Sequence, residues 1–99
     1  MSTPIGRTRD VETVITARYW AGARSAAGVG EDVFVVSGPV TLAEVVSLVL
    51  TAHPGPDVAR TIGVCSVLLG DRPVSTEAAD QVVVAPGSTV EFLPPFAGG

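Results

Sequence analysis

Thr41-Leu42-Ala43-Glu44-Val45-Val46-Ser47-Leu48-Val49 is the stretch of this 99-residue chain with the clearest local structural signal. A threonine followed three residues later by a glutamate is a capping box, in which each side chain satisfies a backbone N–H of the first helical turn. Aliphatic residues then recur at helical spacing along one face, at Leu42, Val45, Val46 and Val49. The stretch therefore predicts an amphipathic helix, which the segment His53-Pro54-Gly55-Pro56 ends.

Segments rich in β-branched and aromatic residues lie on both sides of this helix and predict strands. The strands are expected at residues 11–20, 32–36, 63–69 and 89–93, with a proline-bearing edge strand at 72–74. Short helical turns are expected at 21–27 and 57–60. This order predicts an α+β fold, a mixed four- to five-stranded sheet with one main helix packed on one face. The opposite face of the sheet has little predicted structure to cover it.

Alternation within the first and last strands indicates which side chains face the core. Ile15, Ala17 and Tyr19 share one face of the first strand, which places Trp20 on the other face with Arg18. In the last strand Leu93 has the parity of Glu91 and faces away from Val90 and Phe92. Trp20 and Leu93 are therefore expected on the uncovered face of the sheet, where exposed apolar groups usually mark partner sites.

Composition limits the classes of function that fit. Apolar residues make up 46% of the chain, which is typical of a globular domain, and the formal charge of −4 with scattered arginines argues against a nucleic-acid surface. No apolar run is long enough to span a membrane, and the N-terminus lacks the apolar core of a signal peptide. A single cysteine cannot form an internal disulfide, so a cytoplasmic protein is expected.

The chain shows no catalytic set of its own. Cys65 could be a nucleophile or a sulfur carrier, but its apolar surroundings favour a small buried hydrophobe. His53 is the single histidine and lies at a helix end, so no metal site is expected. The acidic pair Glu31-Asp32 has nothing beside it in sequence to build a site, and no glycine-rich phosphate loop is present.

The chemistry that remains lies in the last six residues, Pro94-Pro95-Phe96-Ala97-Gly98-Gly99. Two prolines end strand pairing and hold the chain extended, so six residues reach about 20 Å from the body. Two residues without side chains then suit a terminus that enters a narrow site. The carboxylate of Gly99 becomes an acyl donor if an enzyme adenylates it, and sulfur can then replace AMP to give a thiocarboxylate. The simplest alternative is a frayed chain end with no role.

Several of these segments together resemble the small, sulfur-carrying subunit of molybdopterin synthase. The similar segments are the helix start at Thr41–Glu44, the strand Cys65-Ser66-Val67-Leu68-Leu69 with its Gly70-Asp71 turn, Arg18-Tyr19-Trp20-Ala21-x-x-Arg24 and, above all, Phe92-Leu93-Pro94-Pro95-x-x-Gly98-Gly99. The resemblance covers residues 11–99 and implies the ubiquitin-like β-grasp fold. It divides the chain into an arm (1–10), a β-grasp domain (11–93) and an extended tail (94–99).

The resemblance also implies a function. A ubiquitin-activating-like adenylyltransferase would use ATP to activate Gly99, and the thiocarboxylate would donate sulfur to a cyclic pterin precursor inside the large catalytic subunit. This chain would bind no cofactor and would be a sulfur-donor subunit without catalytic side chains. Partner contacts are expected at Trp20, Leu93, Pro94, Pro95, Phe96, Ala97 and Gly98.

Other functions fit the same tail. A Gly-Gly end is shared with the sulfur carriers of the thiamin and cysteine pathways and with ubiquitin, although the Pro-Pro spacer favours the molybdopterin branch. A protein modifier joined to targets through Gly99 is one alternative, and because the chain has no lysine it would act as a single tag. A β-grasp interaction module with an inert tail is another.

Overall fold

The computed structural model describes residues 13–95, and within that range the chain forms seven strands and three helices. In chain order these are β1 (Val14–Tyr19), α2 (Ala21–Ala27), β2 (Glu31–Val35), β3 (Val40–Thr41), α3 (Leu42–Ala52), α4 (Pro56–Gly63), β4 (Ser66–Leu69), β5 (Arg72–Pro73), β6 (Val83–Val84) and β7 (Thr89–Leu93). The predicted arm and residues 96–99 lie outside the described residues.

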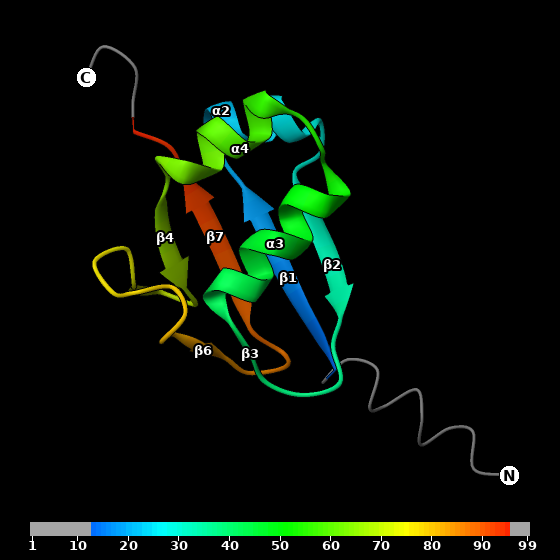
Figure 1. Ribbon diagram of the computed structural model, residues 1–99, viewed down its shortest axis with the longest axis vertical. Helices are drawn as coiled ribbons and strands as arrows, with labels where there is room; N and C mark the ends of the chain where they lie inside the picture. The colour runs from blue at the N-terminus through cyan, green and yellow to red at the C-terminus, as the bar shows by residue number, and fades with distance from the viewer. Residues whose placement is uncertain (1–12, 96–99) are drawn as a thin grey trace, which may run out of the picture.

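A mixed sheet of five strands, in the order β2-β1-β7-β4-β5, is the centre of the described part of the chain (Figure 1). The first and last of its strands in sequence, β1 and β7, lie side by side and run parallel, and the other pairs are antiparallel. The predicted α+β class and the mixed sheet are thereby confirmed. Since β7 lies in the middle, the segment after Leu93 leaves from the interior of the sheet and not from its edge.

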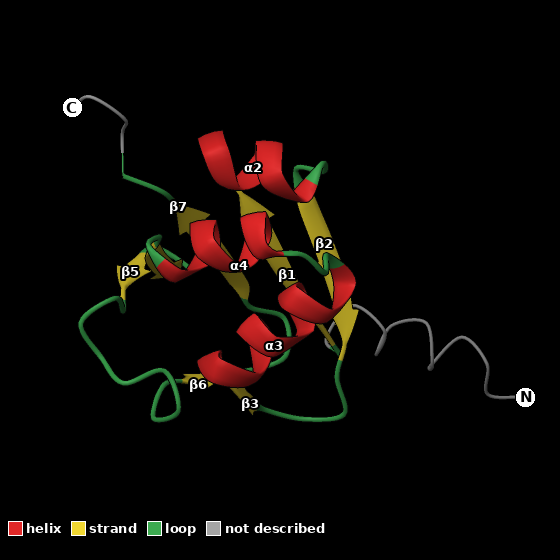
Figure 2. Cartoon of the chain, turned by 45° about the horizontal axis from the view of Figure 1, so that its top comes forward, coloured by secondary structure: helices red, strands yellow, loops and turns green. Residues whose placement is uncertain are grey.

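All three described helices lie on the same side of this sheet, and α3 crosses in front of β1 (Figures 1 and 2). Their apolar faces and the inner face of the sheet form one core, whose fully buried large side chains are Phe92, Ile15, Val45, Val49, Val74, Val84 and Val90. Burial of each such side chain stabilises the fold by about 1.5–3 kcal/mol. Among residues 13–95, no helix combines the length and the apolar character that crossing a bilayer requires.

The predicted start of α3 is confirmed in atomic detail. The Thr41 hydroxyl accepts a hydrogen bond from the backbone N–H of Glu44 at 3.1 Å, and the Glu44 carboxylate accepts one from the Thr41 N–H at 2.7 Å. Leu42, Val45 and Val49 are buried, as the helical spacing predicted. The capping box therefore fixes where α3 begins, and its apolar face fixes how α3 lies on the sheet.

Replacing Thr41 by alanine should lower the free energy of unfolding by about 0.5–2 kcal/mol, because the first turn of α3 loses its side-chain acceptor. Urea denaturation followed by circular dichroism measures this loss. Thr51→Ala is the matched control, since Thr51 is exposed near the end of the same helix. Equal stability of the two variants would contradict the role given to the capping box.

The predicted strand at 63–69 begins too early. Gly63 is the last residue of α4, Val64 is exposed at the helix end, and β4 starts only at Ser66. The apolar run misled the prediction because Val58 and Ile62 are one turn apart and are buried by a helix. Pro56 occupies the first helical position, where its fixed φ suits a helix start, and α4 has eight residues where a single turn was expected at 57–60.

A second, two-stranded ladder of β3 and β6 was not predicted from the sequence. It ties the segment after β5 to the start of α3, where the Leu42 N–H donates to the Val82 carbonyl at 2.9 Å and the Ala43 N–H to the Ala79 carbonyl at 3.1 Å. Residues 74–84 therefore pack on the helix side, and no residue between 13 and 95 forms a layer over the other face of the sheet. We call that second surface the open face.

Candidate functional site

The end of β7 is held rigidly by its neighbours. Val90 and Phe92 are fully buried, and the Phe92 ring lies 6.0 Å from the Tyr19 ring, centroid to centroid, in a stacked arrangement. The Phe92 carbonyl accepts a hydrogen bond from the Trp20 N–H at 3.1 Å. Leu93, Pro94 and Pro95 follow with increasing exposure. The body thus fixes the position from which the tail departs.

Trp20 lies on the open face beside this departure point, as the strand parity predicted. β1 and β7 pair Tyr19 with Phe92, so the next residues, Trp20 and Leu93, are neighbours on the opposite face. The Trp20 side chain is 42% exposed and Leu93 is half-buried. Phe96, Ala97, Gly98 and Gly99, which complete the predicted contact surface and tail, lie outside the described residues.

Charged side chains of three neighbouring strands hold the Trp20 indole in place. Its Nε1–H donates to the Glu91 carboxylate at 2.8 Å, and the Arg18 guanidinium lies 5.2 Å from the ring centroid in a cation–π contact. Arg18 Nε is also 3.7 Å from the Glu31 carboxylate. The indole is therefore oriented before any partner arrives, which reduces the entropy lost on binding.

The sequence prediction named Trp20 and Leu93 but did not predict that Glu91, Arg18 and Glu31 lie in a row that holds the Trp20 indole. Strand register places these three side chains next to one another across β2, β1 and β7, on the open face. The sequence did indicate, by strand parity, that Leu93 shares a face with Glu91 and that Trp20 shares a face with Arg18. That these two pairs of residues lie side by side follows only from the pairing of β1 with β7.

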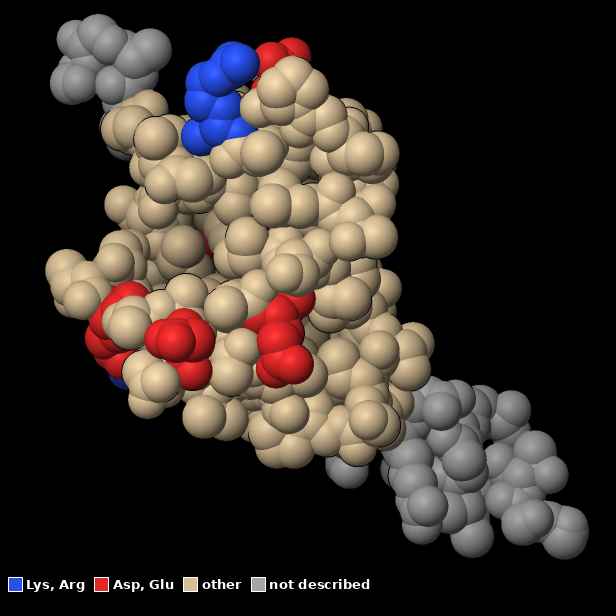
Figure 3. Space-filling view, viewed as in Figure 1, with Lys and Arg blue, Asp and Glu red and all other residues tan. Residues whose placement is uncertain are grey.

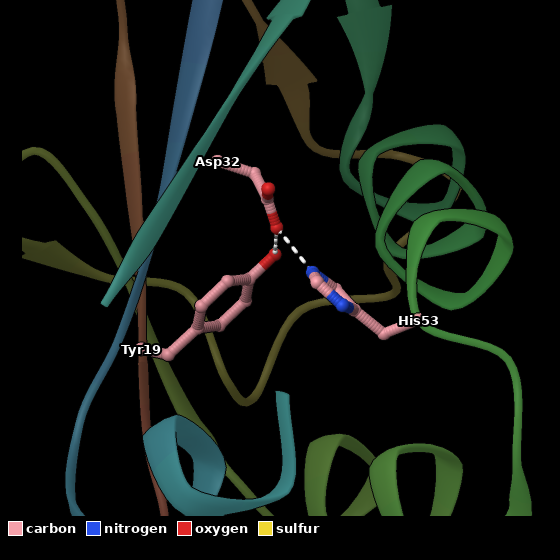
Figure 4. A network of polar contacts seen from close by, with 3 residues as sticks. All are labelled: Tyr19, Asp32 and His53. Atoms are coloured by element: carbon pink, nitrogen blue, oxygen red, sulfur yellow. Dashed lines mark hydrogen bonds and ion pairs between the residues drawn. The ribbon is translucent and has the colours of Figure 1, made fainter. Parts of the chain in front are cut away.

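A second polar cluster lies on the helix side and supports the fold. The Asp32 carboxylate accepts hydrogen bonds from the Tyr19 hydroxyl at 2.8 Å and from His53 Nε2 at 2.5 Å (Figure 4). Burial and then the hydrogen bond to Asp32 raise the pKa of Tyr19 far above its usual value. The cluster ties the end of α3 to β1 and β2, so His53 has a structural partner.

Cys65 lies just before β4, on the rim of an apolar cavity of about 290 Å³ on the helix side. The cavity opens between α3, α4 and the segment after β5, and Glu77 is part of its lining. Acidic side chains gather in the lower part of the face that Figure 3 shows. The thiol donates a hydrogen bond to the Thr61 carbonyl, and burial raises the pKa of Cys65 to about 11. Cys65 was expected to be a small buried hydrophobe, and the structure has it partly buried against the core.

At pH 8, Cys65 should react with iodoacetamide more slowly than an ordinary exposed thiol by on the order of 100-fold, because the thiolate is the reactive form. Mass spectrometry of the alkylated protein over time gives the rate. The control is Ser66→Cys in a Cys65→Ser background, which moves the thiol to the adjacent exposed position. Equal rates for the two thiols would show that burial does not suppress Cys65.

The fold and the site define a ubiquitin-like β-grasp protein that presents a C-terminal segment beside an open sheet face. The profile of the ThiS family matches residues 17–99, and the chain belongs to this family of ubiquitin-like sulfur carriers. No curated protein sequence matches it significantly.

Solved structures with the same fold include proteins that are named for different roles. SAMP1 of Haloferax volcanii has a TM-score of 0.72 at 22% identity, over 87% of this chain and 99% of that one. A putative molybdopterin converting factor subunit 1 of Pyrococcus furiosus gives 0.68 at 14% identity, over 85% and 99%. The complex of subunits 1 and 2 of the molybdopterin-converting factor of Helicobacter pylori gives 0.59 at 16%, over 87% and 99%. At these identities the structures establish the fold and not the pathway.

Proposed function

We propose that this protein is the sulfur-carrying subunit of a molybdopterin synthase. The observation that carries the proposal is the sequence Phe92-Leu93-Pro94-Pro95 continuing a central strand beside an oriented Trp20, followed by Gly98-Gly99. A central strand gives the tail a fixed origin, and two prolines keep it extended. Trp20 and Leu93 give a partner a surface to bind next to that origin.

In this proposal the Gly99 carboxylate is the reacting group. Its oxygen attacks the α-phosphate of ATP on the activating enzyme, so that pyrophosphate leaves and an acyl adenylate forms. A sulfide-level sulfur then attacks the acyl carbon, the bond to AMP breaks, and a thiocarboxylate remains. In the large subunit the thiocarboxylate sulfur attacks a carbon of the cyclic pterin precursor, the carbon–oxygen bond at that carbon breaks with its oxygen as the leaving group, and a thioester joins the carrier to the pterin. Water then attacks the acyl carbon of Gly99, the acyl carbon–sulfur bond breaks, and the carboxylate is restored while the sulfur stays on the pterin. Two loaded carriers supply the two sulfurs of the dithiolene.

The alternative functions share the fold, and sulfur loading followed by sulfur transfer separates them. The intact protein is incubated with the activating enzyme, ATP and sulfide, and we expect the mass increase of one sulfur replacing one oxygen at Gly99. Loaded protein with the large subunit and the pterin precursor should give the dithiolene product, whereas the thiazole-forming enzyme of the thiamin pathway should accept it poorly. Adducts on lysines of other proteins would support the modifier, and an unchanged mass would support the inert module.

Trp20→Ala should weaken binding of the large subunit by about 30-fold, the effect of losing an aromatic hot spot worth roughly 2 kcal/mol. The indole contributes contact area and is held by Glu91 and Arg18. Isothermal titration calorimetry with the isolated large subunit measures the change. Val83→Ala is the control, since Val83 is 62% exposed in the β3–β6 ladder, at the opposite end of the molecule from the end of β7 (Figure 1). If Trp20→Ala bound the large subunit with unchanged affinity, the open face would not be part of the binding surface.

A further inference from the structure

The two edges of the five-stranded sheet differ in how well they are protected from pairing with another strand. At one edge β5 is only two residues long and contains Pro73, which has no N–H to donate. At the other edge β2 has five residues and no proline. Short strands and prolines are the usual devices that prevent pairing between sheet edges, and among the described residues β2 has neither.

The register of β1 with β2 shows which backbone groups β2 directs outward. The Tyr19 N–H donates to the Gly30 carbonyl and the Val36 N–H donates to the Thr13 carbonyl, so even-numbered residues of this strand bond to β1. Alternation of an antiparallel ladder then turns the N–H and carbonyl groups of Glu31, Val33 and Val35 to the free edge. Within residues 13–95 these groups have no backbone partner.

Beyond Glu31, the exposed side chains of this edge are apolar. Val33 is 55% exposed and Val35 is 80% exposed, both on the open face. The Asp32 carboxylate is hydrogen-bonded to Tyr19 and His53 on the helix side, so its charge does not lie beside the two valines (Figure 4). A long, unpaired, aliphatic edge is a template for another strand.

We propose that a second copy of this chain pairs with this edge, β2 against β2 in antiparallel orientation, to form a two-fold symmetric dimer. The register places Phe34 on the two-fold axis, so that Val33 of each copy lies opposite Val35 of the other. An isologous contact needs a surface that complements itself, and outward-facing residues at every second position meet that requirement. This register joins the four valines into one apolar cluster on the open face.

Charge favours this register over the neighbouring one with Val33 on the axis. With Phe34 on the axis, Glu31 lies opposite Ser37 of the second copy, and each Glu31 keeps its own Arg18 at 3.7 Å. Sliding one strand by two residues, so that Val33 lies on the axis, would place the Glu31 carboxylate opposite Val35, in the apolar cluster. On the helix side, a groove of mixed polar and apolar lining, which includes Val36, Glu44 and Leu48, borders the end of β2.

The dimer leaves the functional site open. β1 separates β2 from β7 in the sheet, so Trp20 and Leu93 do not take part in the pairing. The inference therefore stands apart from the proposed function. One five-residue strand edge is small compared with standard interfaces, so the dimer is weak and forms with rising concentration.

Sedimentation equilibrium of the full chain from about 10 µM to 1 mM, the range in which interfaces this small associate, tests the proposal. We expect the average mass to rise from monomer toward dimer. Val33→Lys should weaken the association at least about 10-fold, because two buried ammonium groups face the apolar cluster. Val83→Lys, at an exposed position in the β3–β6 ladder, should leave the association unchanged. Circular dichroism establishes that both variants are folded. Val33→Thr keeps the β-branched shape but places a hydroxyl in the apolar cluster, so it should also weaken the association.

Cysteine crosslinking tests the register. In a Cys65→Ser background, a mixture of Val33→Cys and Val35→Cys proteins should oxidise to the mixed disulfide, since directly opposed residues have Cα atoms about 5.5 Å apart. Val33→Cys alone should crosslink about 10-fold more slowly, because the diagonal separation exceeds disulfide reach. A protein that stays monomeric at 1 mM, a dimer unaffected by Val33→Lys, or faster crosslinking of Val33→Cys alone would overturn the proposal.

Discussion

Deleting Gly98 and Gly99 should abolish sulfur loading and sulfur transfer while leaving the body folded. Two extended residues span at most about 7 Å, so the shortened chain would hold its last carboxylate several bond lengths from the site of adenylation. The described body ends its last strand at Leu93, before the deletion. Mass spectrometry after incubation with the activating enzyme, ATP and sulfide should therefore show no thiocarboxylate, and circular dichroism should match that of the full chain.

A graded version of this experiment separates reach from steric access. Gly99→Ala keeps the length of the tail and adds one methyl group beside the reacting carbon. We expect the methyl group to displace the carboxylate by about 1 Å in the narrow site of the activating enzyme, which should lower the rate of sulfur loading on the order of 100-fold. Gly38→Ala is the matched control, since a β-carbon at Gly38 would contact no atom within 4 Å. If the deleted chain still delivered sulfur to the pterin, Gly99 would not be the carrier and the proposed function would fail.

Local signals in the sequence were enough to predict the elements that carry the site. The capping box with its apolar spacing located α3, and strict alternation in residues 89–93 gave the buried and exposed faces of β7. These signals are reliable in the sequence because each depends only on residues that are close together along the chain. They also placed Trp20 and Leu93 on the uncovered face, where the structure has them.

The contacts that organise the site could not be predicted, because they join distant parts of the chain. The hydrogen bond from Trp20 to Glu91 spans 71 positions, and the pair of His53 with Asp32 spans 21. Both depend on which strands pair and in which register. The two-residue strands β3 and β6 were missed for a related reason, since segments that short carry no periodicity.

The end of α4 shows a different limit of sequence-based prediction. Ile62-Gly63-Val64-Cys65 is apolar whether it is read as a strand or as the last turn of a helix. The choice depends on whether Ile62 packs with Val58, one turn earlier, and that contact requires the core. The segment through Gly63 is helical and not a strand because the side chains of Val58 and Ile62 are both buried on the inner face of α4. Val64 and Cys65 then connect α4 to β4.

Phe92→Ala should lower the free energy of unfolding by about 3–5 kcal/mol, a large part of the roughly 5–15 kcal/mol typical of a small domain. Phe92 is the largest fully buried side chain, and it packs where β1, β7 and β4 meet. Its ring also supports the stacked ring of Tyr19. The alanine variant therefore leaves a cavity directly beneath the point at which the tail leaves the body. Urea denaturation with a fluorescence readout from Trp20 measures the loss.

The matched control for this substitution is Phe34→Ala, which removes the same ring from a half-buried position on the edge strand β2. Its cost should be smaller, since less apolar surface returns to water. Phe92→Leu should retain most of the stability, because a buried side chain of similar volume still fills the site. The leucine variant should therefore load sulfur at the normal rate, since Gly99 and the open face are unchanged. If Phe34→Ala proved the more damaging of the two alanine variants, the junction of β1, β7 and β4 would not be the centre of stability from which the tail is presented.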